Sequence, residues 1–186
     1  MNPIKNKKDL ETTIEEIRNF AYAYLQKYSS SKQQLRTYLF KKFLKKNQKI
    51  FNKKELFNLI DVVISTLLEQ KLISDKYYSD AKTKYFLRRG YSLNKIRYSL
   101  IAKGIGEKYI KASISKIKEN ESDPDFFSAI KICKRRRIGP CREESNRPLF
   151  YKKDISILAR SGFSYEISKK VLEIPKEEFK KFCKMI

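Results

Sequence analysis

Apolar residues recur every three or four positions along most of this chain of 186 residues, which is the spacing of one face of an α-helix. In the first third, this pattern predicts a helix over 9–28, a second helix capped by Ser31, and a third from Lys53 onward. The polar run Lys45–Lys49 is interpreted as a loop. The repeating apolar positions are Ile14, Ile17, Ala21, Tyr24, Leu25, Leu35, Leu39, Phe43, Leu56, Leu59, Ile60, Val63 and Leu67.

Two glycines, Gly90 and Gly104, divide the stretch Ile73–Lys118 into three shorter blocks with the same period. Each glycine stands where a helix tends to end in a left-handed residue, and Ser92 is a plausible N-cap for the helix that follows Gly90. The pattern therefore predicts three short helices joined by tight turns. Their inward stripes are expected to be Tyr78, Ala81 and Tyr85, then Leu93, Ile96 and Leu100, then Ile110, Ile114 and Ile117.

The last third begins with a polar linker that ends at Pro124, a residue that suits the first turn of a helix. Helical spacing then predicts helices over 125–137, 153–161 and 164–172, with a break at Gly139-Pro140 and another at Gly162. The stretch Cys141–Pro148 has no period and is interpreted as a loop. Residues 173–186 are interpreted as a charged tail in which Phe179 and Phe182 dock as a last turn or two. No strand is predicted, and the total is about nine helices.

Several segments of the chain repeat at intervals of about 50 to 60 residues. Ser31-x-x-x-Leu35-Arg36-x-x-Leu39 matches Ser92-x-x-x-Ile96-Arg97-x-x-Leu100, Tyr77-Tyr78-Ser79 with Gly90 matches Phe126-Phe127-Ser128 with Gly139, and Leu100 with Gly104-Ile105 matches Leu158 with Gly162-Phe163. This predicts an all-α fold of three tandem three-helix repeats that form an elongated, curved array. The predicted boundaries are 9–71, 72–119 and 123–173, followed by the tail 174–186. One globular bundle, in which these matches are chance, is the alternative.

The chain is strongly basic, with 43 Lys and Arg against 21 Asp and Glu and a formal net charge of +22. Solubility does not require such an imbalance. It predicts attraction to a polyanion or an acidic protein surface, and association that weakens with salt.

Several kinds of chemistry are excluded by the residues that the sequence lacks. It contains no histidine, so a Ser–His or Cys–His nucleophile has no base and the usual zinc sites lack ligands. We expect no metal, no cofactor and no enzymatic activity. Cys133, Cys141 and Cys183 form no CxxC pair and indicate reduced thiols, although a Cys133–Cys141 bond stays open. The chain has neither a signal peptide nor an apolar run long enough to span a membrane, which predicts a soluble, cytoplasmic protein.

Four ordered motifs resemble the RecX family of regulatory proteins of bacterial RecA recombinase, over roughly residues 20–172. The first pairs Ala21-x-x-Tyr24-Leu25 with Ser31 and Leu35-Arg36-x-x-Leu39, and the second is Leu72-Ile73-Ser74-Asp75 followed by Tyr77-Tyr78-Ser79. The third is Arg88-Arg89-Gly90 with Ile96-Arg97-x-x-Leu100 and Lys103-Gly104-Ile105, and the fourth is Leu158-x-x-Ser161-Gly162-Phe163-Ser164-Tyr165. Ser74 departs from the family pattern, in place of an aspartate, as does Ser161, in place of an arginine.

The resemblance implies a non-enzymatic modulator of homologous recombination, DNA repair and the SOS response. Such a protein lies along the RecA–DNA filament and restrains its extension, strand exchange, ATP hydrolysis and co-protease activity. The implied partners are the RecA filament and, more weakly and electrostatically, single- and double-stranded DNA. We expect a monomer with no membrane partner.

The candidate contacts to filament or DNA are cations that we expect to face outward from the helices. Arg88 and Arg89 could equally cap a helix end, and Arg97 and Lys103 could belong to an ordinary solvated face. Tyrosines at helical spacing are expected to be core residues, with Tyr91 and Tyr98 as possible base-stacking exceptions. The full set of candidates is Arg88, Arg89, Lys95, Arg97, Lys103, Lys108, Lys134, Arg135, Arg136 and Arg137.

Two other classes of function stay open on the sequence. A basic helical protein could bind DNA directly, without a recombinase partner, although no stretch presents an evident recognition helix with side chains set for base edges. An enzyme is the least favoured class, because there is no histidine, no glycine-rich phosphate loop and no recognisable pair of carboxylates.

Overall fold

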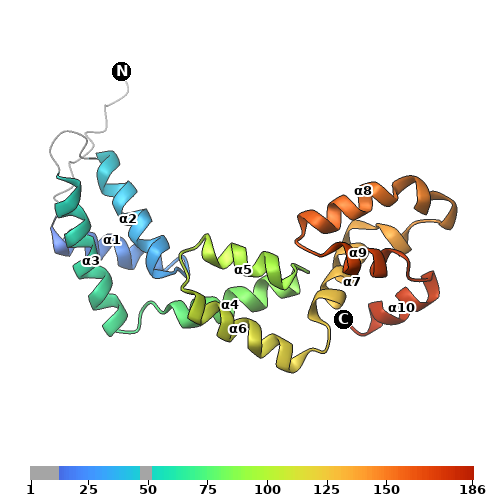
Figure 1. The fold of residues 1–186 in the computed structure, drawn as a ribbon. Coiled ribbons are helices and arrows are strands. Elements are labelled where there is room, and N and C mark those ends of the chain that lie inside the picture. The colour runs from blue at the N-terminus through green and yellow to red at the C-terminus, as the bar shows by residue number, and fades with distance from the viewer. Residues whose placement is uncertain (1–12, 47–51) are drawn as a thin grey trace, which may run out of the picture. The chain divides into compact units, whose positions relative to one another are not determined.

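The computed structural model describes residues 13–46 and 52–186, and every regular element within these ranges is helical (Figure 1). They form ten α-helices and two short 3-10 helices. The predicted all-α fold class is confirmed. The predicted number of nine helices is wrong, because a tenth helix occupies the predicted tail.

The chain forms two compact units that divide between Tyr78 and Ser79, inside α4. The first unit contains α1, α2, α3 and the first turn of α4, and the second contains the remainder. The predicted central and C-terminal repeats thus share one unit, and the three-repeat boundaries stay a prediction. The helices are α1 (Ile14–Leu25), α2 (Lys32–Lys46), α3 (Lys53–Glu69), α4 (Asp75–Arg88), α5 (Leu93–Ile101), α6 (Glu107–Asn120), α7 (Pro124–Arg136), α8 (Arg147–Arg160), α9 (Tyr165–Leu172) and α10 (Lys176–Lys184).

The predicted apolar faces of the first unit close around one core. Its α1 begins after Thr13, whose hydroxyl accepts the Glu16 N–H at 3.2 Å, and residues 9–12 of the predicted first helix lie outside the described ranges. Helix α2 extends to Lys46, into the predicted Lys45–Lys49 loop. The buried apolar residues are Ile17, Ala21, Leu35, Leu39, Phe43, Leu56, Ile60, Val63, Ile64, Leu67 and Ile73.

Serine caps begin three helices, as predicted for Ser31 and Ser92, and Ser164, predicted as the first residue of its helix, is the third cap. The three hydroxyls accept N–H groups three residues later, at 3.1, 3.1 and 3.2 Å. Each bond satisfies a backbone donor that has no partner inside the helix, which is worth about 1 kcal/mol relative to alanine.

Five of the described helices end in the same turn. A left-handed residue follows the helix, and the next N–H donates to the carbonyl five residues back, which is the Schellman arrangement. The distances run from 3.0 Å for Leu72 to Leu67 to 3.3 Å for Phe163 to Leu158. The five left-handed residues are Lys71, Gly90, Gly104, Arg137 and Gly162. The recurrence supports related repeats, but Gly90 is equivalent in this turn to Arg137, not to Gly139 as the sequence match predicts.

An aspartate in the first turn of α4 and another in the first turn of α7 make a second recurring contact. Asp75 Oδ1 accepts the Lys32 N–H at the start of α2, at 2.9 Å, and Asp125 Oδ1 accepts the Leu93 N–H at the start of α5, at 2.7 Å. Each carboxylate thus satisfies an unpaired N–H at a helix N-terminus, where negative charge is favoured. The two contacts link helices that the predicted boundaries assign to successive repeats.

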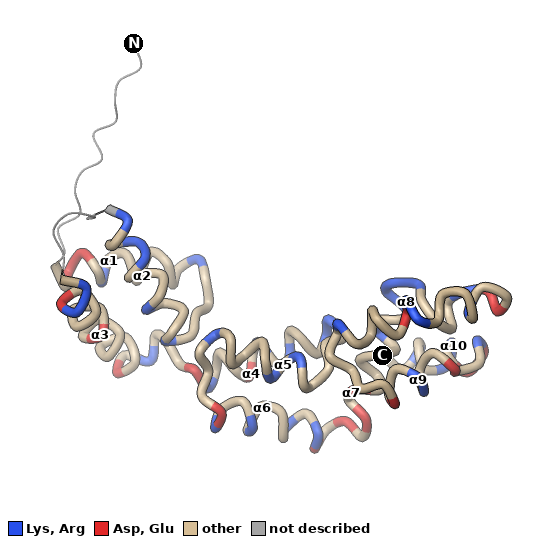
Figure 2. The backbone as a smooth tube through the Cα atoms, turned by 45° about the horizontal axis from the view of Figure 1, so that its top comes forward, with Lys and Arg blue, Asp and Glu red and all other residues tan. Residues whose placement is uncertain are grey.

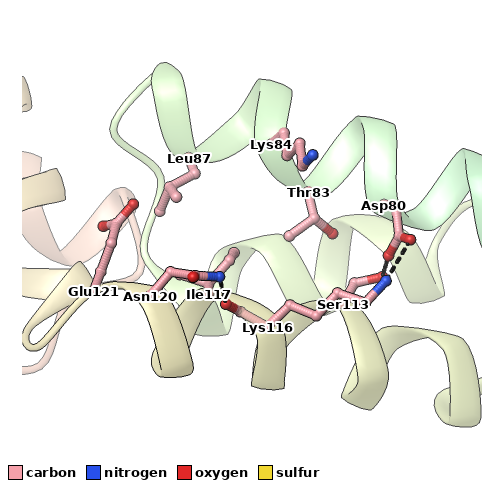
Figure 3. A pocket seen from close by; sticks show the side chains of 9 residues that line it. All are labelled: Asp80, Thr83, Lys84, Leu87, Ser113, Lys116, Ile117, Asn120 and Glu121. Carbon is pink, nitrogen blue, oxygen red and sulfur yellow. Dashed lines mark hydrogen bonds and ion pairs between the residues drawn. The ribbon is translucent and has the colours of Figure 1, made fainter.

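The buried face of α4 differs from the predicted stripe of Tyr78, Ala81 and Tyr85. Ala81 and Tyr85 are exposed, and Ser79, Thr83 and Leu87 are buried instead. Small side chains let α4 approach α6 closely and form polar contacts there. Ser79 Oγ lies 2.9 Å from Ser113 Oγ. Ser113 Oγ also donates to Asp80, at 2.6 Å (Figure 3).

Beside these contacts, Lys116 forms an ion pair with Asp80 at 2.7 Å (Figure 3). Both residues line a cavity of about 200 Å³ between α4 and α6. The Thr83 hydroxyl has no hydrogen-bond partner among the described residues, although it is buried. This face is therefore held by polar pairing and close approach, where the sequence pattern predicts apolar burial.

The predicted loop over Cys141–Pro148 is largely helical. Two 3-10 helices (Gly139–Cys141 and Glu144–Asn146) lead into α8, which begins at Arg147, six residues before the predicted start at Lys153. A buried carboxylate accounts for this order. Asp154, which is 1% exposed, accepts two bonds from the Arg142 guanidinium at 2.8 Å and one from the Gly139 N–H at 2.9 Å.

The predicted tail folds as α10 and completes the core of the C-terminal helices. Phe179 is 4% exposed, and the Phe182 ring meets the Phe126 ring edge-on at 5.1 Å. The docking of these two aromatic residues is confirmed, but the segment is a full helix. The buried residues of this core are Phe126, Ala129, Ile130, Ile132, Cys133, Ile138, Leu158, Phe163, Val171, Leu172, Ile174 and Phe179.

Candidate polyanion-binding surface

The turn after α4 packs directly on α7. Gly90 adopts a φ of +75°, and a Cβ added to it would lie 2.9 Å from the Ser128 carbonyl oxygen and 3.2 Å from Lys131 Cβ. A side chain larger than hydrogen would therefore be both strained and obstructed. This close approach fixes the cationic end of α4, with Arg88 and Arg89, beside α7.

Arg135 of α7 reaches back to the end of α4. Its Nη1 donates to the Arg89 carbonyl oxygen at 2.8 Å, which satisfies an acceptor that the helix leaves unpaired at its C-terminus. Arg89 itself donates to the Tyr85 hydroxyl at 2.6 Å, and this bond raises the pKa of its guanidinium. Arg89 and Arg135, two predicted contact residues from different predicted repeats, thus lie together, and both are exposed.

The start of α5 brings a third predicted cation to the same turn. Lys95 Nζ donates to the Arg160 carbonyl oxygen at the end of α8, at 2.7 Å, and lies 4.8 Å from the centre of the Tyr91 ring. Gly162, at a φ of +88°, lets the turn after α8 approach α5, since an added Cβ would lie 2.7 Å from Lys95 Cβ and closer still to Ser92 Oγ. These contacts place the backbone of Arg160, an exposed residue, beside Lys95.

We name this cluster the junction surface and define it as Arg88, Arg89, Lys95, Arg135 and Arg160. All five belong to the second unit, in which Lys and Arg are spread over α5 to α10 (Figure 2). An acid, Asp125, lies beside the cluster, where its carboxylate accepts the Leu93 N–H and partial burial raises its pKa. Five cations on neighbouring helix ends would create a local positive field that suits phosphates or acidic side chains.

The ion pair of Arg97 is with a residue outside this cluster. Arg97 pairs with Glu107 at the start of α6, at 3.0 Å, just as Arg36 of the matching segment pairs with Asp61 at 2.6 Å. This pairing favours the structural role for Arg97 that the sequence leaves open. Lys103 is half-buried in the turn after α5, and Lys108 is exposed in the first turn of α6.

The four adjacent cations 134–137 do not act as one group. Lys134 Nζ donates to the Cys183 carbonyl oxygen of α10 at 3.2 Å, whereas Arg135 bonds to the end of α4. Arg136 is exposed, and Arg137 is the left-handed residue that ends α7, with a φ of 54°. Only Arg135 of this run is placed in the junction surface by a contact.

The two tyrosines proposed for base stacking differ in their surroundings. Tyr91 already stacks on Phe86, with ring centres 5.3 Å apart and planes within 7°. Tyr98 is 60% exposed, with the Arg97 guanidinium 5.9 Å from its ring centre. Tyr98 therefore presents the more accessible ring. The Arg97 guanidinium near this ring is the one that pairs with Glu107.

Sequence reasoning missed Arg160. Arg160 stands immediately before Ser161, and the family pattern has an arginine at the position of Ser161. An arginine one position away from the expected one was therefore the signal that could have indicated Arg160. The same reasoning also missed both aspartate contacts, because nothing in a linear pattern pairs Asp125 with the backbone of Leu93.

In the described ranges, no group of three His, Cys, Asp or Glu side chains is arranged to hold a metal ion, and the three cysteines are free thiols. Among the same residues, no helix combines the length and the apolar character that crossing a membrane requires.

The fold defines a class, that of all-α helical repeat proteins, and the surface of this chain is basic. No protein-family model matches the chain. It is 27% identical over 165 residues to a protein of Myxococcus xanthus called regulatory protein RecX, with 84% of each chain covered. It is 26% identical over 161 residues to the regulatory protein RecX of Agrobacterium fabrum, which covers 87% of this chain and 84% of the relative.

Two crystal structures have a similar fold. That of RecX from Lactobacillus salivarius superimposes with a TM-score of 0.58 at 17% identity, covering 90% of this chain and 97% of the other. A second structure, of a regulatory protein RecX, gives 0.57 at 20% identity, covering 87% and 74%. The two relatives agree with the resemblance of the four sequence motifs to the RecX family, and the two crystal structures show that the fold is similar.

Proposed function

We propose that this protein is a non-enzymatic regulator that binds the RecA–DNA filament and restrains its extension. Strand exchange, ATP hydrolysis and co-protease activity, and with them recombination, DNA repair and the SOS response, would fall as filaments shorten. The proposal is supported by relatives that are named regulatory proteins and by the RecA partner that the sequence resemblance implies.

The observation that carries the proposal is the junction surface. Arg135 and Lys95 use their side chains to bond backbone carbonyls of neighbouring helices, at 2.8 and 2.7 Å, so the cations are held in place before any partner arrives. Cations that are already ordered lose less conformational entropy on binding. A filament has polyanionic DNA along its axis, and phosphates that meet this surface would release their counterions.

Non-enzymatic action is part of the proposal. The sequence contains no histidine, so the common triads and dyads of nucleophilic catalysis lack their base. A regulator that acts by binding needs only complementary charge and shape. It would act in the cytoplasm, as a monomer.

The proposal is tested by measuring ATP hydrolysis by the cognate RecA on single-stranded DNA while this protein is added. Restraint of filament growth predicts inhibition at well below one regulator per recombinase subunit, because one molecule blocks many subsequent additions. The control is the same titration with a threefold excess of DNA. If hydrolysis is unaffected up to equimolar regulator, the proposal is wrong.

Direct binding to DNA is the second candidate, and the net charge of +22 favours it. It predicts inhibition only when the DNA sites themselves are occupied, and relief by the added DNA. Phosphate contacts would dominate such binding, since they are independent of sequence. Substoichiometric inhibition that excess DNA does not relieve separates the two functions.

A further inference from the structure

A groove lies between α10 and the 3-10 helix Gly139–Cys141, and none of the residues that line it belongs to the junction surface. Its volume is about 580 Å³, within the range of small-ligand and side-chain pockets. The floor is formed by Pro140, Cys141, Phe179 and Cys183. Pro140 and Phe179 are buried, and the two cysteines are half-buried. The groove is therefore apolar at its base.

The floor is also uncharged at neutral pH. Burial raises the pKa of the Cys141 thiol and of the Cys183 thiol, so both stay protonated. A protonated thiol behaves as a small apolar group. An apolar side chain could therefore occupy the groove without meeting an unpaired charge.

The rim of the groove is strongly basic. Four exposed lysines line it, namely Lys176, Lys180, Lys181 and Lys184. Glu177 is the acid in the lining, and it is already paired with Lys180 at 2.7 Å. The successive positions 176, 180 and 184 lie four residues apart, so these three lysines share one face of α10.

We propose that this groove binds an acidic peptide segment of a partner protein, with one apolar side chain in the floor and carboxylates on the lysine rim. The proposal does not rest on the recombinase-regulator function, since α10 carries none of the junction surface. Apolar burial sets the position of the peptide, and the lysines provide attraction and fast encounter. A nucleic acid would use the rim but not the floor, because phosphates gain nothing from a thiol and a phenylalanine.

The proposal is tested with the full chain and fluorescent peptides of twelve residues, by anisotropy at 50 and 200 mM salt. One peptide is rich in Glu and Asp around a central Leu-Phe pair. The second has the same charge with Ser-Ser in place of Leu-Phe, and the third keeps Leu-Phe among neutral residues. We expect the first to bind at least tenfold more tightly than either of the others.

A double charge-reversal variant tests whether the peptide binds at this groove. Lys180→Glu with Lys184→Glu should weaken the first peptide at least tenfold. The matched control is Lys41→Glu with Lys45→Glu on α2, where both lysines are exposed, the spacing is again four residues and the change in net charge is identical. Affinity lost equally in both pairs would mean that net charge alone attracts the peptide, and would overturn the proposal.

Alkylation of the thiols gives an independent readout that does not require a variant. Bound peptide should slow the reaction of Cys141 and Cys183 with iodoacetamide at least threefold, as followed by mass spectrometry of each cysteine. Unchanged rates at saturating peptide would place the peptide elsewhere and reject the groove. Equal protection by a single-stranded oligonucleotide of matched charge would identify a nucleic-acid surface instead, which also contradicts the proposal.

Discussion

In the first unit Asp75 accepts the N–H of Lys32 at 2.9 Å, and in the second unit Asp125 accepts the N–H of Leu93 at 2.7 Å. The two bonds have the same chemistry, since each joins a first-turn carboxylate to the start of another helix. Their surroundings differ. The first bond is exposed and the second is partly buried. The hydrogen bond therefore defines where the two helices meet. The neighbouring contacts determine how stable each helix–helix contact is.

The second contact is reinforced by close backbone approach. Around Asp125, Gly90 packs on the Ser128 carbonyl and Gly162 packs on Lys95, and Arg135 bonds the Arg89 carbonyl. Around Asp75, the added bond is from the Tyr78 hydroxyl to Gln34. Partial burial of Tyr78 raises its pKa to about 12, so this donor keeps its proton throughout the physiological range. The reinforced contact is also the one that assembles the junction surface.

Gly90→Ala should break the second contact and produce the largest effect. The variant combines left-handed strain with a Cβ 2.9 Å from a backbone oxygen, which cannot move as a side chain can. We expect a loss of about 2–3 kcal/mol in the free energy of unfolding, measured by urea titration. Gly106→Ala is the matched control, because its φ of −67° is ordinary and an added Cβ would meet nothing within 4 Å. Similar losses in both variants would contradict the assigned role of Gly90.

Asp125→Ala should cost more than Asp75→Ala. We expect about 1–2 kcal/mol for the partly buried contact and about 0.5–1 kcal/mol for the exposed one, within the range for lost N-terminal helix caps. The direct measurement is amide hydrogen exchange at Leu93 in the first variant and at Lys32 in the second, relative to the unsubstituted protein. Equal loss of protection at the two amides would show that burial adds nothing.

Lys71→Gly should stabilise the protein at the turn that precedes the first contact. Lys71 adopts a φ of 56° in the turn between α3 and α4, a conformation that costs an ordinary residue about 1 kcal/mol. Glycine removes this cost but gives the unfolded chain more freedom, so the expected net gain is about 0.5 kcal/mol. Lys76→Gly, on the exposed surface of α4, is the control and should destabilise by about 1 kcal/mol. A loss of stability in Lys71→Gly would contradict this account of the turn.

The smallest expected effect is a pH dependence of the second contact. Burial raises the pKa of Asp125, so the folded state binds this proton more tightly than the unfolded state does. The resulting stability is present below about pH 4, the unfolded value, and is lost as the pH rises through the folded value. Asp125→Asn should therefore be at least as stable as the original protein at pH 7 and lose this advantage near pH 4. Urea unfolding at both pH values tests this, and an advantage that grows in acid would contradict it.

The parts of the fold that depend on local signals could be predicted from the sequence. Ser31, Ser92 and Ser164 cap helices because a hydroxyl before an apolar run needs no distant partner. The left-handed turns at Gly90 and Gly104 were predicted for the same reason. The apolar faces of α1 to α3 followed their helical period, since burial there is by large aliphatic side chains.

The parts that depend on distant partners could not be predicted in this way. The buried face of α4 consists partly of small polar residues, Ser79 and Thr83, and Ser79 contacts Ser113. A search for periodic apolar residues cannot detect such packing. The early start of α8 depends on the Asp154–Arg142 pair, which spans the predicted loop. At the candidate site, the cations 88, 89, 95 and 135 could be nominated from charge, but only the structure joins them to Arg160.

The junction surface is tested most directly by the binding of two charge-reversal variants to a preassembled RecA filament on single-stranded DNA. Arg88→Glu with Arg160→Glu changes the surface, and Lys41→Glu with Lys45→Glu makes the same change in net charge on α2. The account predicts at least tenfold weaker binding for the first variant, with a log–log salt slope reduced by about 1 for each lost contact, and little change for the second. Equal weakening of both variants, or undiminished binding of the first, would contradict it.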